Sequence, residues 1–229
     1  MFDIPMDLKS LEKSIIAYEQ EPIEKGKILF YGQSMFTRWG SPKYGYRRMD
    51  EDIRMKDGSL AVVNHGFGTS TSEEQLYFYD RMVRPWEPRA LVIAPYGNDT
   101  MYGYGPDQTM ANLSKILHWA RTDFPGIRLF ILEPHPTPKA KQVTLPDKWN
   151  GGLHQRLKFM EMIDIYEQTH DDTTVIHLWN RPEFFETPED VGDFHKVRED
   201  IFVADGVHLN QAGYDIFRDI FLDALDELL

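Results

Sequence analysis

The sequence carries four polar side chains whose types match the parts of a serine acyl-transfer reaction. Ser34 and Asn98 each follow a short apolar run, while Asp205 and His208 stand three residues apart, ahead of the last helical pattern. Acyl transfer by a serine needs a nucleophilic hydroxyl, a basic imidazole, a carboxylate that orients the imidazole, and donors for the oxyanion. The chain therefore offers a candidate for each part.

Asp205 and His208 belong to the tetrapeptide DGVH. At this spacing in a loop, the carboxylate can hold Nδ1 of the ring, so that Nε2 can accept a proton from a hydroxyl. Two other interpretations fit the same residues. Asp205 could make only a turn with Gly206 while His208 caps or packs, or the pair could bind a metal, for which no clear third ligand is present.

The other candidates have structural alternatives as well. Serine is common as the capping residue of a helix, so Ser34 could serve only that purpose. Asn98 lies in Gly-Asn-Asp, which is favourable turn chemistry. Gly66 and Gly68 permit unusual backbone angles, but so short a glycine loop is weak evidence for phosphate binding. It is the shared position of these residues after apolar runs that favours chemistry.

Short apolar runs and helical patterns alternate along the chain. The runs lack strict period-two alternation, as expected for strands that are covered on both faces. We expect strands at 27–31, 60–64, 90–96, 128–132 and 173–178, and helices at 7–19, 72–83, 107–123, about 150–169, and 210–229. This order predicts an α/β fold, a three-layer doubly wound sandwich around a mostly parallel five-stranded sheet.

Such folds bind ligands at the carboxyl ends of their strands, which is where the candidate residues are expected. Two segments have no helical or strand pattern. The Pro-rich segment 133–146 is predicted to be a long loop near the edge of the site, and 181–200 is a second irregular stretch.

Composition limits the class of protein. A chain of 229 residues that is 41% apolar fits one domain spanning 1–229. A net charge of −12 argues against a nucleic-acid partner and disfavours strongly anionic substrates.

The absence of cysteine excludes disulfides, thiolate metal sites and a cysteine nucleophile. The N-terminus has no signal-like pattern, and no apolar run approaches the roughly 20 residues of a membrane span, so we expect a cytoplasmic protein without a membrane partner.

Taken together, four ordered blocks resemble the SGNH hydrolases, also called the GDSL esterase/lipase family. The blocks are FYGQS at 30–34, NHGFGTS at 64–70, YGND at 96–99, and DGVHLNQAGY at 205–214. The last block is the most specific, because the acid, the histidine and the start of the following helix all fit the family pattern. The resemblance covers nearly the whole chain and implies the same three-layer sandwich.

The resemblance also implies roles for the residues. Ser34 attacks an ester carbonyl, His208 acts as general base and then general acid, and Asp205 orients His208. The oxyanion is bound by the Ser34 backbone N–H, by a backbone N–H of the second block, and by the Asn98 side-chain amide. The family requires no metal and no organic cofactor.

Two positions depart from the family pattern. The residue before the serine is usually Asp, and here it is Gln33, which changes the charge of the turn more than the chemistry. The usual oxyanion glycine falls on Thr69, and a β-branched residue disfavours positive φ. We therefore expect either that Thr69 donates from an ordinary backbone conformation or that Gly68 takes the role, and the alignment slightly favours Thr69.

The substrate is less well defined by the sequence. Arg38, Trp39, His65 and Tyr96 lie near the candidate residues and could contact substrate. Aromatic rings with polar rims suit a sugar or another small polar alcohol, although packing of the loops explains the same rings equally well. No apolar lid of the lipase type is evident, so we expect a small-molecule ester substrate, with an acetylated sugar as the leading candidate.

Several alternatives stay open. His135, which follows the fourth predicted strand, competes with His208 as the base, although only Glu133 lies nearby to orient it. The function could instead be that of a lipase, lysophospholipase or thioesterase of the same family, or of a binding protein that has lost turnover. A flavodoxin-like nucleotide binder fits the alternation of elements but lacks a phosphate loop. A homo-oligomer is also open, without a patch in the sequence to argue for one.

Overall fold

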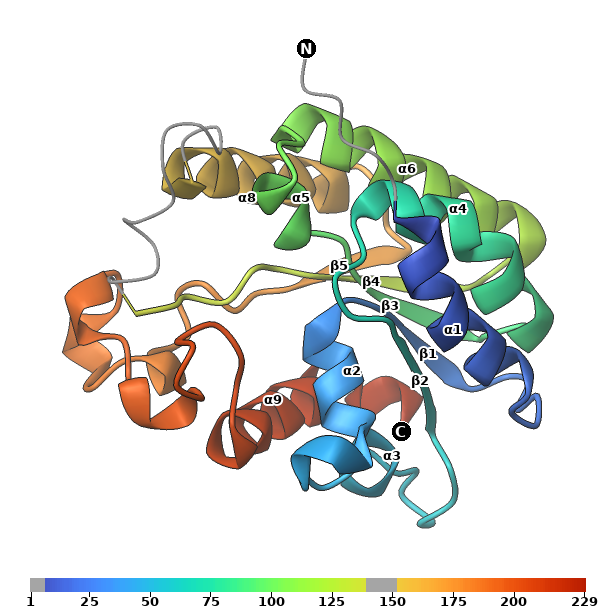
Figure 1. Cartoon of the computed structure of the whole chain (residues 1–229), viewed down its shortest axis with the longest axis horizontal. Coiled ribbons are helices and arrows are strands. Elements are labelled where there is room, and N and C mark those ends of the chain that lie inside the picture. The colour runs from blue at the N-terminus through green and yellow to red at the C-terminus, as the bar shows by residue number, and fades with distance from the viewer. Residues whose placement is uncertain (1–6, 139–151) are drawn as a thin grey trace.

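The computed structural model describes residues 7–138 and 152–229. Its centre is a sheet of five strands in the order β2-β1-β3-β4-β5, and every neighbouring pair is parallel. The strands are β1 (Ile28–Gly32), β2 (Val62–Gly66), β3 (Ala90–Ala94), β4 (Arg128–Leu132) and β5 (Thr173–Ile176). The predicted three-layer α/β sandwich is confirmed, with helices on both faces of the sheet (Figure 1).

Alternate side chains of each strand enter two separate cores. In β1, Ile28 and Phe30 belong to one cluster of buried residues, whereas Leu29 and Tyr31 belong to the other. All of these side chains are essentially inaccessible to solvent. A strand that is apolar on both faces can be stable only between two helical layers, which explains why the runs lack alternation in the sequence.

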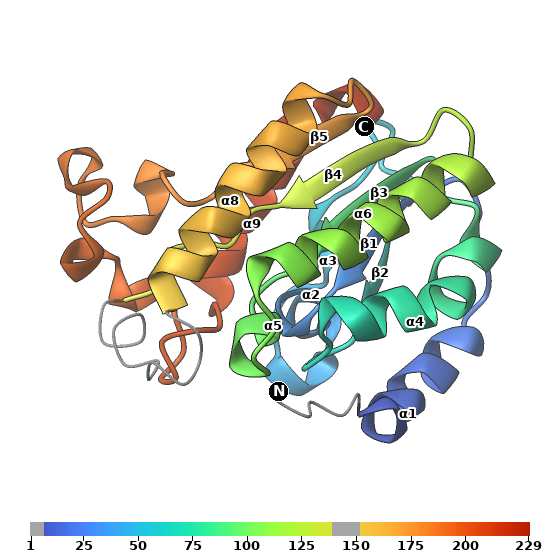
Figure 2. The same cartoon turned by 90° about the horizontal axis from the view of Figure 1, so that it is seen from above.

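One helical layer packs on the face of Leu29 and Tyr31, and the other on the face of Ile28 and Phe30 (Figures 1 and 2). The first contains α1 (Leu8–Glu19), α4 (Ser72–Met82), α6 (Pro106–Asp123) and α8 (Gly152–Gln168). The second contains α2 (Ser34–Gly40), α3 (Met49–Asp52) and α9 (Gln211–Ala224). None of the helices in the described ranges combines the length and apolarity needed to cross a bilayer.

The long helices begin at residues that satisfy their free N–H groups. Thr71 and Glu74 form a capping box at the start of α4, and the Asn210 side chain accepts the Gly213 N–H at the start of α9. Pro106 opens α6 at a position where a missing N–H costs nothing. These local signals explain why the predicted helix starts agree with the structure.

The predicted elements differ from the structure mainly at short helices and element ends. The sequence did not predict α2, α3 or the one-turn helix α5 (Asn98–Met101). Residues 150–151 of the predicted fourth helix lie outside the described residues, as do residues 139–146 of the predicted loop. The stretch 181–200 contains one-turn 3-10 helices rather than only irregular chain. The 3-10 helices of the described residues are Pro42–Tyr44, Arg84–Trp86, Pro182–Phe184, Pro188–Asp190, Phe194–Lys196, Glu199–Ile201 and Asp226–Leu228. That residues 1–229 form one domain stays a prediction.

Candidate active site

The candidate residues come together at the carboxyl ends of three neighbouring strands. Gly32 at the end of β1 pairs with Gly66 of β2 on one side and with Ala94 of β3 on the other. The chain segments that follow these strands therefore leave the sheet at the same edge (Figure 2). The sheet register thus brings the blocks containing Ser34, Thr69 and Asn98 next to one another.

Ser34 is the first residue of α2, directly after β1. The residue that caps this helix is Gln33, and its side chain makes no capping hydrogen bond. The capping interpretation of Ser34 is therefore wrong. Its hydroxyl instead lies 2.9 Å from Nε2 of His208, which is 174 residues further along the chain.

Gly66 allows α2 to lie against the end of β2. A Cβ atom at this position would come within 2.2 Å of the Thr37 backbone nitrogen and 2.6 Å of the Phe36 carbonyl carbon. Both contacts involve backbone atoms of α2, which cannot move without moving the helix and Ser34 with it. Only glycine therefore permits this position of the serine.

The carboxylate of Asp205 both stabilises the turn 205–208 and contacts the ring of His208. Oδ1 of Asp205 accepts the backbone N–H groups of Val207 and His208, each at 2.9 Å. Oδ2 lies 2.7 Å from Nδ1 of the His208 ring. The turn interpretation and the catalytic interpretation of this tetrapeptide are thus compatible, because each uses a different oxygen.

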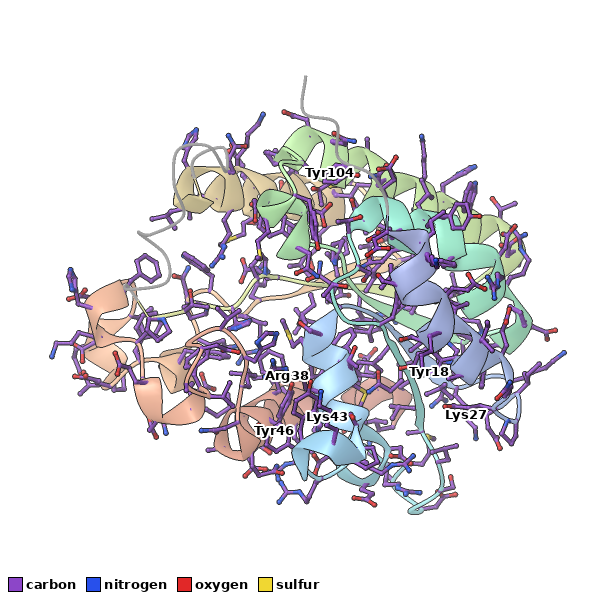
Figure 3. All side chains as sticks on the ribbon, viewed as in Figure 1. Tyr18, Lys27, Arg38, Lys43, Tyr46 and Tyr104 are labelled. Carbon is purple, nitrogen blue, oxygen red and sulfur yellow. The ribbon has the colours of Figure 1, made fainter. Side chains whose placement is uncertain are left out.

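The contacts to Asp205 favour its ionised form. Burial raises the pKa of this carboxyl group, but the two backbone N–H groups and the His208 ring outweigh burial and lower the pKa to about 2. Arg38 of α2 adds a longer ion pair, with 3.6 Å between its guanidinium and Oδ2. The Arg38 guanidinium also lies over the Tyr44 ring, and Arg38, Lys43 and Tyr46 lie together beside α2 (Figure 3). Arg38 therefore contacts Asp205 rather than the cavity described below.

The segment after β2 differs from one of the two sequence expectations. Thr69 adopts the left-handed conformation with φ 70°, so the expectation that it would keep an ordinary conformation is wrong. Gly68 lies directly against the serine, since a Cβ atom built on it would be 3.6 Å from the Ser34 Cβ. Position 69 thus has a backbone conformation typical of glycine, although its residue is threonine. This conformation lowers the free energy of unfolding by on the order of 1–3 kcal/mol.

Asn98 lies on the third segment, at the start of α5. Its side-chain amide donates one hydrogen bond to the Ser70 carbonyl at 2.9 Å, and the amide has a second N–H to donate. The preceding residue, Gly97, has φ 126°, which a residue with a side chain rarely adopts. The hydrogen bond to Ser70 connects Asn98 to the segment that contains Gly68 and Thr69.

A buried carboxylate that the sequence did not single out holds these two segments together. Asp99 is fully buried and accepts hydrogen bonds from the Ser72 N–H and hydroxyl and from the Thr109 hydroxyl. Burial raises the pKa of Asp99 to about 7, although these hydrogen bonds oppose the rise. The only sequence signal was its position directly after Asn98.

A cavity of about 180 Å³ opens beside Ser34 and His208. Asn98 and Tyr96 line it from the end of β3, and Pro134 and His135 line it from the segment after β4. Of the substrate contacts expected from the sequence, Tyr96 is the one that lines this cavity.

Two expected substrate contacts are corrected. Trp39 is fully buried, stacks on Tyr214 and donates its indole N–H to Asp52, so it belongs to the core. His65 is also fully buried, with its ring against Trp86 and its Nδ1 2.6 Å from the Met82 carbonyl. Burial lowers the pKa of His65 to about 4. Neither side chain can reach a ligand in the cavity.

His135 lies at the same cavity as His208, but none of the described carboxylates forms a partner for its ring. Its Nε2 lies 3.1 Å from the Val207 carbonyl, and burial lowers the pKa of its ring to about 4. Glu133 does not orient it, because Oε2 of Glu133 accepts the backbone N–H groups of Leu178 and Trp179. This geometry favours His208 as the base.

One group of potential metal ligands lies in the described part of the chain. Candidate ligand atoms of Glu133, Asp164 and His177 all lie within 4.8 Å of one another. The Glu133 carboxylate, 3.6 Å from Nδ1 of His177, raises the pKa of that ring. Protonated His177 would balance the nearby carboxylates, so an ion cluster explains the group without a metal.

Comparisons with known proteins identify the family and the fold of the chain. Residues 30–216 match the model of the GDSL-like Lipase/Acylhydrolase family. A search of curated proteins gave no match. A GDSL-like lipase from Bacteroides thetaiotaomicron has a similar structure, with 18% identity, a TM-score of 0.66, and coverage of 97% of this chain and 98% of that one.

Two further solved structures share the fold. A lipase/acylhydrolase from Enterococcus faecalis is 18% identical, with a TM-score of 0.65 and coverage of 87% of this chain and 95% of that one. A mutant of an acetyl-xylooligosaccharide esterase from Geobacillus is 14% identical, with a TM-score of 0.63 and coverage of 89% and 95%. At these identities the structures show the fold, while the family match extends over most of the sequence. The chain belongs to the GDSL-like lipase/acylhydrolase family.

Proposed function

We propose that this protein is a serine esterase that hydrolyses small acyl esters, acetyl esters in particular. The observation that carries the proposal is the continuous chain of contacts from the Ser34 hydroxyl to His208, at 2.9 Å, and from His208 to Asp205, at 2.7 Å. This chain lies at the wall of a cavity that can hold an acyl group.

In the proposed reaction, Ser34 Oγ attacks the ester carbonyl while His208 Nε2 takes the hydroxyl proton. Asp205 holds the Nδ1–H of the ring and stabilises the imidazolium that forms. When the tetrahedral intermediate collapses, the bond to the alcohol oxygen breaks and His208 gives that oxygen its proton. A water molecule then attacks the acyl-enzyme with His208 as base, which releases the acid and restores Ser34.

Three N–H donors at or near Ser34 would stabilise the oxyanion. These are the Ser34 backbone N–H, a backbone N–H from the Gly68–Thr69 segment, and the second amide hydrogen of Asn98. The proximity of Gly68 to Ser34 and the anchoring of Asn98 on Ser70 support this assignment. One positioned donor of this kind lowers the barrier by roughly 3–4 kcal/mol.

The cavity favours a small acyl group. At about 180 Å³ it is smaller than the roughly 300–1,000 Å³ of typical pockets for drug-sized ligands. The structural likeness to an acetyl-xylooligosaccharide esterase makes an acetylated sugar the leading candidate substrate. Because Trp39 is buried in the core, the sugar would not stack on that ring.

Labelling with a fluorophosphonate tests the nucleophile directly. Wild-type protein should be labelled on Ser34, and Ser34→Ala should not be labelled although it folds normally by circular dichroism. Absence of labelling in wild type would support a binding protein without turnover instead.

A panel of nitrophenyl esters tests the size of the acyl group. We expect kcat/KM to be highest for acetyl and propionyl esters and to fall as the chain lengthens. A preference for acyl chains of about ten carbons or more would overturn the small-acyl proposal and favour a lipase or thioesterase.

A further inference from the structure

The cavity beside Ser34 contains one permanently charged side chain among its described residues, and that side chain is a cation. Arg156 of α8 lines the cavity together with Gln33, Ser34, Tyr96 and His208. No described residue that lines the cavity is an aspartate or a glutamate. In a chain with a net charge of −12, an isolated guanidinium at this place requires an explanation.

Arg156 has no carboxylate partner within the described residues. The ion pairs of the described residues involve other cations, such as Arg38, Arg121 and Lys158. None of the described carboxylates lies within 4.0 Å of the Arg156 guanidinium. Burial lowers the pKa of Arg156, as expected for a guanidinium without a carboxylate partner among the described residues. Its guanidinium carbon lies 5.5 Å from the centre of the Trp179 ring, and a guanidinium stacked on an aromatic ring can still donate its N–H groups to a ligand.

Two other donors at the cavity also lack a hydrogen-bond acceptor among the described residues. The Tyr96 hydroxyl is buried without a hydrogen bond, and its ring is fixed by stacking on Phe159 at 4.6 Å. The side-chain Nε2 of Gln33 is likewise buried and unpaired. Both residues are more than nine-tenths buried, and unsatisfied polar groups at this depth are costly unless a ligand or water satisfies them.

We propose that this cavity binds a carboxylate of the substrate, with Arg156 as its charge partner and with Tyr96 and Gln33 as additional donors. The inference rests on the proposed esterase function and specifies its substrate as an ester that also carries a carboxylate. The carboxylate could belong to the acyl group or to the alcohol, since either can enter a cavity beside Ser34. Arg156 is a specificity residue in this proposal and takes no part in proton transfer.

The experiment compares two matched pairs of esters. On the acyl side, the mono-nitrophenyl ester of fumaric acid is compared with the nitrophenyl ester of fumaramic acid, because the trans double bond keeps the carboxylate away from its own ester. On the alcohol side, 4-acetoxybenzoate is compared with 4-acetoxybenzamide. Each pair exchanges a carboxylate for a neutral amide of nearly the same shape.

In wild type we expect kcat/KM for the carboxylate to exceed that for the amide by about tenfold or more in one pair. Arg156→Gln should abolish this preference, so that the ratio of the two kcat/KM values falls to about one. Lys158→Gln is the matched control, because it removes one positive charge from the same helix at an exposed ion pair with Asp107. Its preference should equal that of wild type.

Gln33→Glu gives a second test that does not depend on the folding of the Arg156 variant. It places a carboxylate of the same shape in the cavity, which should reverse the preference in favour of the amide. The proposal is overturned if wild type prefers the amides in both pairs, or if both cavity variants keep the wild-type ratio. If Ser34-dependent hydrolysis of the neutral esters persists in that case, only the carboxylate inference fails. If the wild-type protein hydrolyses none of the esters, the esterase proposal itself is contradicted.

Discussion

The two sides of the candidate site hold their functional groups in different ways. On one side, the turn 205–208 fixes His208 through contacts within four consecutive residues, and every oxygen of Asp205 has a partner. On the other side, Thr69 and Asn98 are held by contacts between segments about 28 residues apart, through the Ser70 carbonyl and the buried Asp99. The first side is local and relaxed, while the second depends on tertiary structure and contains a strained threonine.

The difference shows what determines the cost of positioning a side chain at the candidate site. In the local turn, burial raises the pKa of Asp205, but its hydrogen bonds to the backbone and to the His208 ring outweigh burial and lower the pKa to about 2. A long-range network needs buried polar groups, and burial raises the pKa of Asp99 to about 7. Changes on the turn side should therefore affect activity most, and changes on the Asp99 side should affect stability as well.

The largest expected effect is at the histidine of the turn. His208→Ala should lower kcat for a nitrophenyl acetate by about 10⁴-fold, because among the described residues only His208 offers a base to Ser34 Oγ. His135→Ala, at the same cavity, should retain most of the activity. Steady-state kinetics of both variants decides the point, and the opposite ranking would assign the base to His135.

The next effect is at the carboxylate of the turn. Asp205→Asn should keep the turn, because an amide oxygen can still accept the N–H groups of Val207 and His208. It should lower kcat by roughly 10²–10⁴-fold, since the ring loses the acceptor that fixes its tautomer. An unchanged thermal midpoint would show that the loss is chemical. Near-normal activity would mean that the local turn alone positions His208.

The buried Asp99 predicts a pH dependence of stability on the other side of the site. Its pKa of about 7 in the folded protein exceeds the ordinary value of roughly 4 in the unfolded chain. The folded state then binds a proton that the unfolded state has lost, so stability falls as pH rises from about 4 to 7. The slope for one such group is at most about 1.4 kcal/mol per pH unit.

Urea denaturation at several pH values between 5 and 8 measures this contribution. The Asp99→Asn variant lacks the titrating group, so the free energy of unfolding should depend less on pH in the variant than in wild type. Equal pH dependence in both proteins would show that Asp99 does not titrate in this range.

The smallest expected effect concerns the strained threonine. Thr69→Gly should raise the free energy of unfolding by about 0.5–1 kcal/mol, because relief of the positive φ exceeds the entropy cost of glycine. Thr69→Ala is the matched control, since it keeps a Cβ and therefore the strain. Urea denaturation that finds glycine no better than alanine would contradict the idea that the backbone at position 69 is strained.

The sequence was sufficient to predict what local patterns determine. The five strands and the long helices follow from apolar runs and caps, and the Asp205–His208 contact follows from a spacing of three residues in a glycine-containing turn. The closeness of Ser34 to His208 was implied by the family resemblance, because His208 lies beyond β5 in a segment that does not directly follow a strand.

The features that were missed depend on tertiary packing. Trp39 and His65 were expected at the substrate, but residue type does not tell which side of a short helix or strand is covered, and both are fully buried. The left-handed conformation of Thr69 contradicts the preference of its residue type and is imposed by its surroundings. Arg156 lies within an ordinary helical pattern, so its unpaired position at the cavity could be recognised only in the structure.

The contact of Gly66 with α2 makes the tolerance of this protein to variation uneven. A loop can drift by an ångström and still deliver a side chain, because the side chain can rotate to compensate. Ser34 has no such freedom, because its position is set by α2, which packs directly against the backbone of Gly66. Sequence change around this scaffold can therefore be extensive at its outer loops, while the contact of Gly66 with the backbone of α2 leaves no room for even a methyl group.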